Sequence, residues 1–438
     1  MKNKLDSLFF NRQFCAEAQN CCDRRGEITC VISPRGLSVK RFGMEVIMKE
    51  QIREYINQIG PKLEALSNRI YDLAEISCQE FQSCQLLEDC LKENGFQVEH
   101  GVGGMETSFR AVYEQGEGGP SFGLLAEYDA LSMGHGCGHQ MQGPAILGAA
   151  FCIKELADDR PVKIVVYGTP AEESLGGKII MQENGCFQDI DIALMMHAAP
   201  ETCVDIKTMA LENFRVTFYG KEAHAAMNPE KGRSALDAIL ISFHGIELLR
   251  EHVLEDTRMH YTVLDAGGPT NVVPGKATAE YTLRSYNTSY LAQIVERFKK
   301  IIEGSALITE TTYTMERDPA YSAKIPCLKL NELIMDNARA FDAPQIAPPR
   351  EKTGSTDFGN VMYQVPGSCI RLAFVPAGTP AHSQAYLDAG KSEAAHRAVR
   401  LSAEILAATC LDILETPGLM EEIKEDFAQR KEQMGKTV

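Results

Sequence analysis

The spacing of apolar residues predicts alternating helices and strands over the first half of the chain. From Met48 onward they recur at intervals of four and three, which predicts an amphipathic helix with one buried face: Ile52, Ile56, Ile59, Leu63, Leu66, Ile70 and Leu73. The segment SCQLLEDCLKENGF predicts a second helix, which Gly95 closes. Short apolar strands then alternate with helices as far as His197, a pattern typical of a mostly parallel sheet covered by helices on both faces.

The order of elements changes between about Leu211 and Met315. Strand and helix patterns there follow one another as FRVTFYG, SALDAILISFHGIELL, HYTVLDAG, ATAEYTLRSY, LAQIVERFKKIIEG and TETTYTM. This βαββαβ order predicts a two-layer, ferredoxin-like α+β unit. Because the first pattern resumes with KIPCLKLNELIMDNARAF and ends in EAAHRAVRLSAEILAATCLDIL, we interpret this unit as a lid inserted into the first domain.

These patterns divide the chain into four parts. Residues 48–208 and 318–420 are predicted to form a discontinuous α/β domain, residues 209–317 the lid, and residues 421–438 a polar C-terminal tail. Residues 1–47 contain four cysteines and mixed charge, and residues 1–43 show no sustained period. We therefore expect a disordered leader there, with Met44 or Met48 as the natural start of the protein.

Charge and cysteine content narrow the class of protein. A formal net charge of -16 over 438 residues argues against nucleic acid or an anionic membrane as a partner. Because no run of about 18 apolar residues occurs, no transmembrane helix is expected. The 14 cysteines are scattered singly through the predicted elements, which favours reduced thiols in a cytoplasmic enzyme over a disulfide scaffold.

Ligand-type side chains gather where the predicted strands end. The strand in FGLLAEYDALSMGHGCGHQ is followed by Glu127, Asp129, His135, Cys137 and His139. Three more strands end in the same way, with KIVVYG leading to Glu172 and Glu173, IDIALMMH ending on His197, and IRLAFVP preceding His382. Open α/β sheets place their sites at strand ends. More than four thiolate, imidazole and carboxylate groups suit zinc or a similar ion, and they suggest two metals.

Each of these residues has a simpler explanation when it is taken alone. A lone histidine at a strand end is more often a hydrogen-bonded loop residue than a ligand, and two adjacent glutamates usually form a solvated turn. Chance would, however, have to place such residues at four strand ends and to gather HGCGH from only ten histidines. The combined pattern therefore favours a metal site.

Five short segments resemble the dinuclear-metal aminoacylase and carboxypeptidase family, family twenty of the metallopeptidases. They read HGCGHQ, GTPAEES, GKEAHAA, NVVP and GSTDFGN, and they occur in order within residues 48–414. The resemblance is strongest to the branch that contains p-aminobenzoyl-glutamate hydrolase and the dipeptidases related to aminoacylase. Gly136 and Gln140 depart from the HACGH(N/D) segment of that branch, and the longer Gln140 amide is expected to shift hydrogen bonds around the ligands.

The resemblance implies a metal-dependent amidohydrolase. Its substrate would be a small N-acyl amino acid, a dipeptide or a p-aminobenzoyl-glutamate-type amide. One or two divalent ions (zinc, manganese or cobalt) would be bound by Cys137, His139, Glu173, His197 and His382. The ions would polarise the carbonyl group and lower the pKa of an attacking water molecule from about 15.7 toward neutrality.

Glu172 is expected to carry the proton in this reaction. A glutamate that binds metal is held ionised, so Glu173 cannot exchange protons easily, whereas the neighbouring Glu172 remains free to do so. Asp129 is expected to orient a ligand imidazole, with Glu127 and His135 as further helpers.

The lid contributes candidates of its own. His224, in GKEAHAA, reads as a turn histidine, but the resemblance implies that it polarises the substrate carbonyl, within its own chain or across a homodimer formed by the lids. An amide and a guanidinium suit a substrate carboxylate, which predicts binding by Asn271 and Arg284. Gly354 and Ser355, with Thr356 and Asp357, form either a helix cap or a contact to substrate.

Two other readings of the same residues stay open. Cys137 could be the nucleophile of a thiol hydrolase, with His139 or His135 as its base. Alternatively, the chain could be a non-catalytic protein that binds a metal or a ligand. Glu172 argues against this second reading, because a binding protein needs ligands but no proton carrier.

Overall fold

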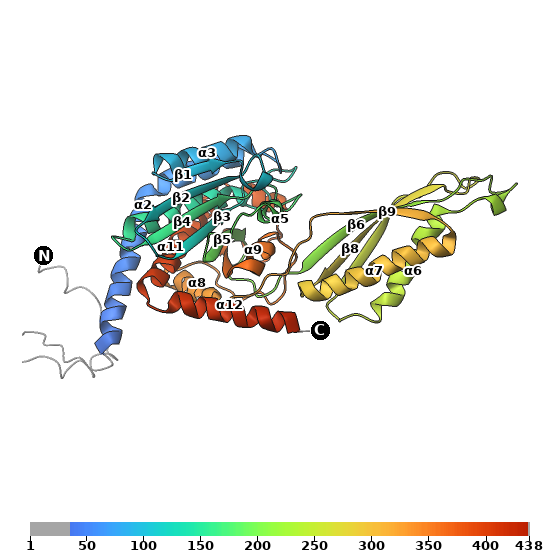
Figure 1. Ribbon diagram of the computed structural model, residues 1–438. Coiled ribbons are helices and arrows are strands. Elements are labelled where there is room, and N and C mark those ends of the chain that lie inside the picture. Colours follow the sequence, from blue (N-terminus) through green and yellow to red (C-terminus); the bar gives the residue numbers. More distant parts are fainter. Residues whose placement is uncertain (1–35, 437–438) are drawn as a thin grey trace, which may run out of the picture. The chain divides into compact units, whose positions relative to one another are not determined.

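The computed structural model describes residues 36–436, with side chains for residues 47–435. The first domain is built on a six-stranded sheet in the order β1-β2-β4-β3-β5-β10 (Figure 1). Its strands are β1 (Gln97–His100), β2 (Phe109–Gln115), β3 (Ser121–Ala126), β4 (Val162–Gly168), β5 (Ile192–Ala199) and β10 (Gly367–Ala373). Strands β4, β3, β5 and β10 are parallel, and β2 and β1 are added antiparallel at one edge. The predicted mostly parallel sheet is confirmed.

Helices cover both faces of this sheet. The helices outside the lid are α2 (Gly36–Leu73), α3 (Phe81–Glu93), α4 (Gln142–Leu156), α5 (Gly177–Glu183), α8 (Leu328–Ala340), α9 (Phe358–Gln364), α10 (Gln384–Ala389), α11 (Glu393–Glu415) and α12 (Leu419–Lys436). Helix α4 lies between the sheet and α11, and every residue from Gln142 to Ile153 is therefore buried. On the other face, α5 and α9 pack with Leu125, Val165 and Met195 of the sheet.

Helix α2 begins before its predicted position. The apolar stripe predicted a helix from Met48, but α2 starts at Gly36, so the expectation of disorder is wrong for residues 36–47. The chain has no proline between Pro34 and Pro61, and the helix can therefore extend toward the N-terminus without a break. The rest of the predicted leader, residues 1–35, lies outside the described residues.

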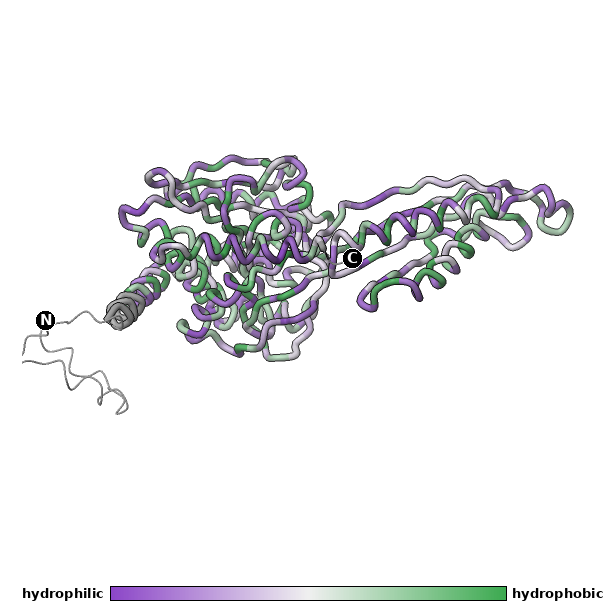
Figure 2. Tube along the Cα trace, turned by 60° about the horizontal axis from the view of Figure 1, so that its bottom comes forward, coloured by the Kyte–Doolittle hydropathy of each residue, from purple (hydrophilic) through white to green (hydrophobic). Residues whose placement is uncertain are grey.

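The segment expected to be a polar C-terminal tail forms helix α12, along which hydrophilic residues predominate (Figure 2). Its Ile423 and Phe427 are nevertheless buried, and the helix packs against α8. A helix with such a narrow apolar face is stabilised by tertiary packing rather than by its own sequence.

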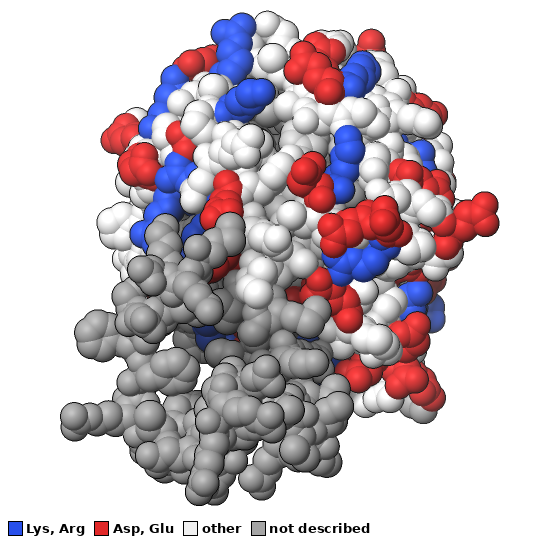
Figure 3. Space-filling model, turned by 90° about the vertical axis from the view of Figure 1, so that its left-hand side faces the viewer, with Lys and Arg blue, Asp and Glu red and all other residues white. Residues whose placement is uncertain are grey.

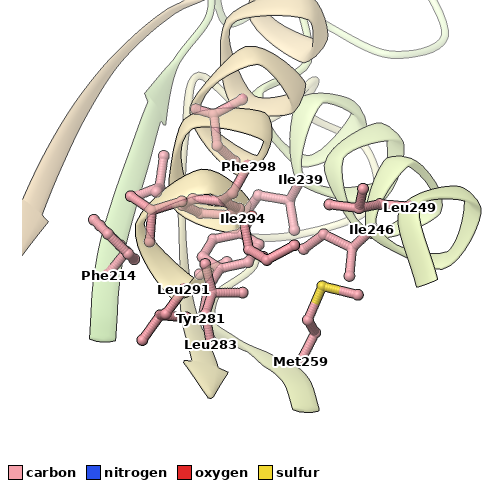
Figure 4. Packing of buried hydrophobic residues seen from close by; sticks show 14 of the residues in the cluster. Phe214, Ile239, Ile246, Leu249, Met259, Tyr281, Leu283, Leu291, Ile294 and Phe298 are labelled. Atoms are coloured by element: carbon pink, nitrogen blue, oxygen red, sulfur yellow. The ribbon is translucent and has the colours of Figure 1, made fainter. Parts of the chain in front are cut away.

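The lid is a four-stranded antiparallel sheet in the order β7-β8-β6-β9, with two helices on one face. Its elements are β6 (Ala210–Tyr219), α6 (Ala235–Arg250), β7 (Arg258–Asp265), β8 (Lys276–Ser285), α7 (Thr288–Thr309) and β9 (Thr312–Arg317). The predicted ferredoxin-like βαββαβ order is confirmed. Phe214 of β6, Tyr281 of β8 and Phe298 of α7 lie in the apolar core between the sheet and the two helices (Figure 4). Buried and less buried residues alternate along β8, which places Arg284 on the face opposite these helices.

Within the described part of the chain, no helix combines the length and the apolar character that crossing a membrane requires. On the face of the molecule shown in Figure 3, acidic and basic side chains are interspersed. The described residues of that face therefore present a mixed surface rather than the continuous basic patch that nucleic acids select.

Candidate active site

The predicted ligands come together beyond the ends of parallel strands. They are Cys137 and His139 after β3, Glu173 after β4, His197 in β5, and His382 after β10, and the predicted proton carrier Glu172 directly precedes Glu173. Parallel strands present their carboxyl ends at one edge of the sheet, which explains the convergence. The Cys137 Sγ lies 3.6 Å from His197 Nε2. Glu173 Oε1 lies 3.9 Å from His139 Nε2 and 3.7 Å from His382 Nε2.

His382 is held in an uncommon backbone conformation. Its φ of 57° falls in the left-handed region, which residues other than glycine seldom adopt. Its backbone N–H donates to the carbonyl of Gly136 at 2.9 Å, which fastens the loop after β10 to the loop after β3. Backbone strain that surrounding contacts maintain in this way is typical of functional sites.

Hydrogen bonds select one tautomer at each of two buried imidazoles. His139 Nδ1 donates to the Asp129 carboxylate and to the Asp129 carbonyl, both at 3.1 Å. His197 Nδ1 donates to the carbonyl of Ala198 at 2.8 Å. Because these oxygens can only accept, the neutral form of each ring carries its lone pair on Nε2, the atom that a cation would bind. Asp129 thus contacts the ligand imidazole as the sequence predicted, and it also accepts from the hydroxyl of Ser77 at 2.8 Å.

The donor atoms fit divalent cations. The ligand atoms of Cys137, His139 and His197 all lie within 4.8 Å of one another, and so do those of Cys137, Glu173 and His382. Among the described residues, His139 Nε2 and Glu173 Oε1 are buried without any hydrogen-bond partner. Buried polar atoms without partners are rare in folded proteins unless a ligand meets them. Cys137 belongs to both groups, so the set has room for one or two ions.

A buried lysine that the sequence analysis missed lies beside these ligands. Lys178 is fully buried at the start of α5, and its Nζ lies 2.5 Å from Glu127 Oε1 and 2.8 Å from Asp357 Oδ1. Gln142 donates to the other Glu127 oxygen at 2.7 Å. Burial opposes ionisation of Glu127, but Lys178 and then His139 outweigh it and lower the pKa of Glu127 to about 2. Lys178 therefore keeps Glu127 in its charged form, whereas burial raises the pKa of Asp357 in spite of its contact with Lys178.

Glu172 differs from its acidic neighbours. Its carboxylate makes no hydrogen bond or ion pair with the described residues, although its oxygens lie within 4.8 Å of those of Glu127 and Asp357. Burial, followed by the charges of Glu127 and Asp357, raises the pKa of Glu172 well above its usual range. Glu172 is thus the carboxyl group of this cluster best suited to accept a proton.

The environment of Cys137 disfavours a free thiolate. Burial raises the pKa of the Cys137 thiol to about 11, whereas a catalytic cysteine needs a lowered pKa. Burial, assisted by Arg371, lowers the pKa of His197 to about 3, so this imidazole is neutral near pH 7. A neutral imidazole suits metal binding better than the activation of a thiol, which leaves an imidazolium.

Two expectations near the ligands differ from the structure. His135 Nε2 bonds to the carbonyl of Ile70 at 3.1 Å, so this histidine is a buried structural residue and not a helper at the cluster. Gln140 donates to the carbonyl of Gly390 at 3.2 Å, and its longer side chain reaches away from the ligands instead of shifting their hydrogen bonds.

The helix-cap reading of the GSTD segment fits Thr356, whose Oγ1 accepts a hydrogen bond at 3.3 Å from the N–H of Phe358, the first residue of α9, but it does not fit Asp357. Asp357 precedes α9, but its side chain makes no capping bond and instead binds Lys178 from a fully buried position. Ser355 Oγ accepts a hydrogen bond from Arg284 at 3.1 Å, which joins two predicted substrate contacts across the lid connection. Gly354 is exposed, and its carbonyl accepts from Met209 at 3.1 Å.

His224 and Asn271 lie together in two adjoining lid loops. The backbone N–H of Ala225 donates to the carbonyl of Asn271 at 3.0 Å. The side chains of His224 and Asn271 are both exposed. His224 Nδ1 accepts from the N–H of Ala226 at 3.2 Å, which leaves the proton of a neutral ring on Nε2. Within the part of the chain that the structure describes, neither residue contacts the ligand cluster of its own protomer.

The lid matches a family model. Residues 208–309 correspond to the family described as a peptidase dimerisation domain of the M20 type. The chain is 30% identical over 444 residues to a p-aminobenzoyl-glutamate hydrolase polypeptide from Escherichia coli, a match that covers 83% of this chain and 91% of that protein. It is 31% identical over 400 residues to the Xaa-Arg dipeptidase of Mus musculus, a match that covers 87% of this chain and 92% of the mouse protein.

A solved structure has the same fold. The crystal structure of a dinuclear metal-binding peptidase of the M20 family from Bacillus subtilis superposes with a TM-score of 0.64. The superposition covers 82% of this chain and 99% of that chain, at 18% sequence identity. This structure shows a similarity of fold, whereas the two relatives described above are similar to the chain in sequence.

Proposed function

Since the chain belongs to the M20 family of metallopeptidases, we propose that it is a metal-dependent amidohydrolase that cleaves the amide bond of a small substrate bearing an amino-acid carboxylate. The observation that carries this proposal is the buried pair of His139 Nε2 and Glu173 Oε1, which have no hydrogen-bond partner among the described residues and lie 3.9 Å apart. The named relatives act on p-aminobenzoyl-glutamate and Xaa-Arg dipeptides, and these two amides are the first substrates to test.

Cys137, His139, Glu173, His197 and His382 would hold one or two divalent ions, with zinc, manganese and cobalt as the candidates. Ions bound there supply Lewis acidity, which polarises the amide carbonyl and makes water acidic enough to react near neutral pH. Asp129 supports this by keeping the Nδ1 proton of His139 in place and thereby orienting its Nε2 lone pair.

Glu172 is the proton carrier of the proposed reaction. Its carboxylate is free of hydrogen bonds within the described residues, next to the Glu173 ligand. In its ionised form it takes a proton from the attacking water and then gives that proton to the departing amide nitrogen. Its elevated proton affinity suits both halves of this exchange, because a strongly acidic carboxyl would hold the proton too weakly.

Removal of the metal is the experiment that tests this function. Dialysis against a chelator is expected to abolish hydrolysis of p-aminobenzoyl-glutamate and of Xaa-Arg dipeptides, and added zinc, manganese or cobalt is expected to restore it. Elemental analysis before and after dialysis is the control for metal loss. Full activity in metal-free protein would instead support a thiol hydrolase based on Cys137 and would overturn the proposal.

We place the enzyme in the cytoplasm. All ten cysteines of the described part are free, and seven of them are buried. Free buried thiols of this kind are usual in a reducing compartment.

The lid supports a proposed homodimer. The end strands β7 and β9 each have one edge without a partner in the described chain. The lid also exposes large apolar side chains, namely Leu240, Leu248, Val263, Leu264, Leu307 and Ile308. Open strand edges and exposed apolar residues favour association, which agrees with the description of the matched family model.

His224 is proposed to act from the partner lid. Its Nε2–H can donate to the oxyanion that forms at the amide carbon, so His224→Ala is expected to lower kcat by roughly 10² to 10³ with metal content unchanged. The exposed lid histidine His252, changed to alanine, is the matched control and should leave kcat unaltered.

Mixing two inactive variants tests whether His224 acts across the dimer. After the protomers have exchanged, Glu172→Gln and His224→Ala chains should regain part of the activity, because some mixed dimers contain one intact site. Absence of recovery after exchange has been verified with labelled chains would exclude catalysis across the interface.

A further inference from the structure

Tyr321 lies at the connection between the lid and the first domain, and neither its sequence pattern nor the proposed function assigns it a role. Its backbone forms two hydrogen bonds with Leu211 at the start of the lid, each 3.0 Å long. These bonds fix the backbone of Tyr321 against β6.

The ring of Tyr321 lies against the turn that carries the catalytic glutamates. A Cβ placed on Gly176 would lie 2.9 Å from the Tyr321 hydroxyl oxygen, so a side chain at position 176 would displace the phenol. Gly176 follows Glu173 by three residues and has a φ of 65°, which glycine adopts easily. The turn therefore keeps space for the Tyr321 ring beside Glu172 and Glu173.

The Tyr321 hydroxyl is a donor without an acceptor. Among the described residues it has no hydrogen-bond partner, although the residue is partly buried. Burial and the nearby charges of Asp357 and Glu172 raise the pKa of Tyr321, which keeps the phenol protonated. The hydroxyl oxygen is not among the fully buried side-chain atoms without a partner, so a ligand that enters from solvent can reach it. A bound ligand would supply the missing acceptor.

Arg284 shares the lid connection with Tyr321 and also lacks an anionic partner. It is half-buried, and its one side-chain hydrogen bond goes to the neutral Ser355 hydroxyl. The same face of the lid sheet carries Arg215, which is paired with Glu280 at 3.5 Å. No carboxylate of the described residues lies within ion-pair distance of Arg284, and its guanidinium is therefore available for one.

We propose that Tyr321 determines substrate specificity by donating its hydroxyl hydrogen bond, together with Arg284, to the α-carboxylate of the amino acid that hydrolysis releases. This inference rests on the proposed function, because it concerns the same amide substrate. A guanidinium with a hydroxyl donor nearby matches the two oxygens of a carboxylate. Substrates whose carboxylate is replaced by an uncharged carboxamide would lose the negative charge and one of the two acceptor oxygens and would bind weakly.

Tyr321→Phe tests this assignment because it removes only the hydroxyl oxygen. Kinetics should be measured with p-aminobenzoyl-glutamate and alanyl-arginine and with the α-carboxamide of each. For the carboxylates, kcat/KM is expected to fall roughly tenfold to a hundredfold through a higher KM, as befits a hydrogen bond to a charged group. For the carboxamides, which offer a single neutral carbonyl oxygen, the loss should be markedly smaller.

Further variants separate recognition from structure. Tyr313→Phe removes another lid phenol that packs on Phe218, and it should change neither KM nor kcat. In an Arg284→Gln background, Tyr321→Phe should have a much smaller effect, since the two donors share one carboxylate. A loss of kcat with unchanged KM would move Tyr321 to the reacting carbonyl and overturn the proposal, as would an equal loss for carboxylates and carboxamides.

Direct binding distinguishes failure of this inference from failure of the proposed function. If the metal-loaded wild type hydrolyses neither amide, the proposed function fails. Calorimetric titration of wild type and Tyr321→Phe with p-aminobenzoyl-glutamate and with alanyl-arginine then tests carboxylate binding by Tyr321 and Arg284 in the absence of turnover. Weaker binding by the variant supports the proposed role of Tyr321. Equal affinities of the two proteins, or no binding to either of them, overturn that role.

Discussion

Glu172→Gln is expected to lower kcat by a factor on the order of 10² to 10⁴, the usual contribution of a general acid and base. Glutamine keeps the shape of the side chain but cannot take a proton from water. Glu172 forms no hydrogen bond within the described residues, so the substitution removes no structural contact. Metal content and the midpoint of thermal unfolding should therefore remain those of the wild type, and turnover alone should fall.

The matched control is Glu183→Gln in α5, an exposed glutamate eleven residues further along the chain. It should leave kcat unaltered. Retained turnover in Glu172→Gln would remove Glu172 from the proton-carrying role. Loss of metal from that variant would mean that Glu172 is a ligand and that its role and that of Glu173 are exchanged.

The fold was predictable because apolar residues recur in the sequence at the spacing that each helix or strand requires. Strand β8 of the lid alternates buried and less buried residues, and the two lid helices return apolar residues to one face. The start of α2 was missed because Lys49 and Glu50 interrupt the spacing of apolar residues between Val46 and Ile52. A helix can continue through such a segment even though the spacing of apolar residues there does not predict it.

The site was predictable only in part. Cys137, His139 and Glu173 are of residue types that a strand end seldom needs for packing, so their clustering in the sequence is informative. Lys178 and Tyr321 carry no such signal, because a single lysine after a Gly-Gly pair or a single tyrosine in a connection usually faces solvent. Their importance arises from contacts between segments far apart in the chain, such as Lys178 with Asp357, 179 residues later.

Lys178 links three segments that surround the catalytic glutamate. Its ammonium group binds Glu127 at the end of β3 and Asp357 before α9, and its own N–H donates to Asp357 at 3.0 Å. Lys178→Met keeps a side chain of similar length but leaves two buried carboxylates without their cation. Breaking a buried ion pair in this way is expected to lower the free energy of unfolding by about 3–5 kcal/mol.

Urea unfolding of the metal-loaded protein measures this loss, with Lys299→Met on the exposed face of α7 as the matched control, expected within about 0.5 kcal/mol of the wild type. Adding Asp357→Asn to Lys178→Met should recover part of the stability, because it removes one uncompensated charge. Without Lys178, burial raises the pKa of the remaining carboxylates above their values in the unfolded chain, so the loss should shrink at pH 5 and grow at pH 8. Wild-type stability in Lys178→Met at both pH values would show that Glu127 and Asp357 do not depend on this lysine.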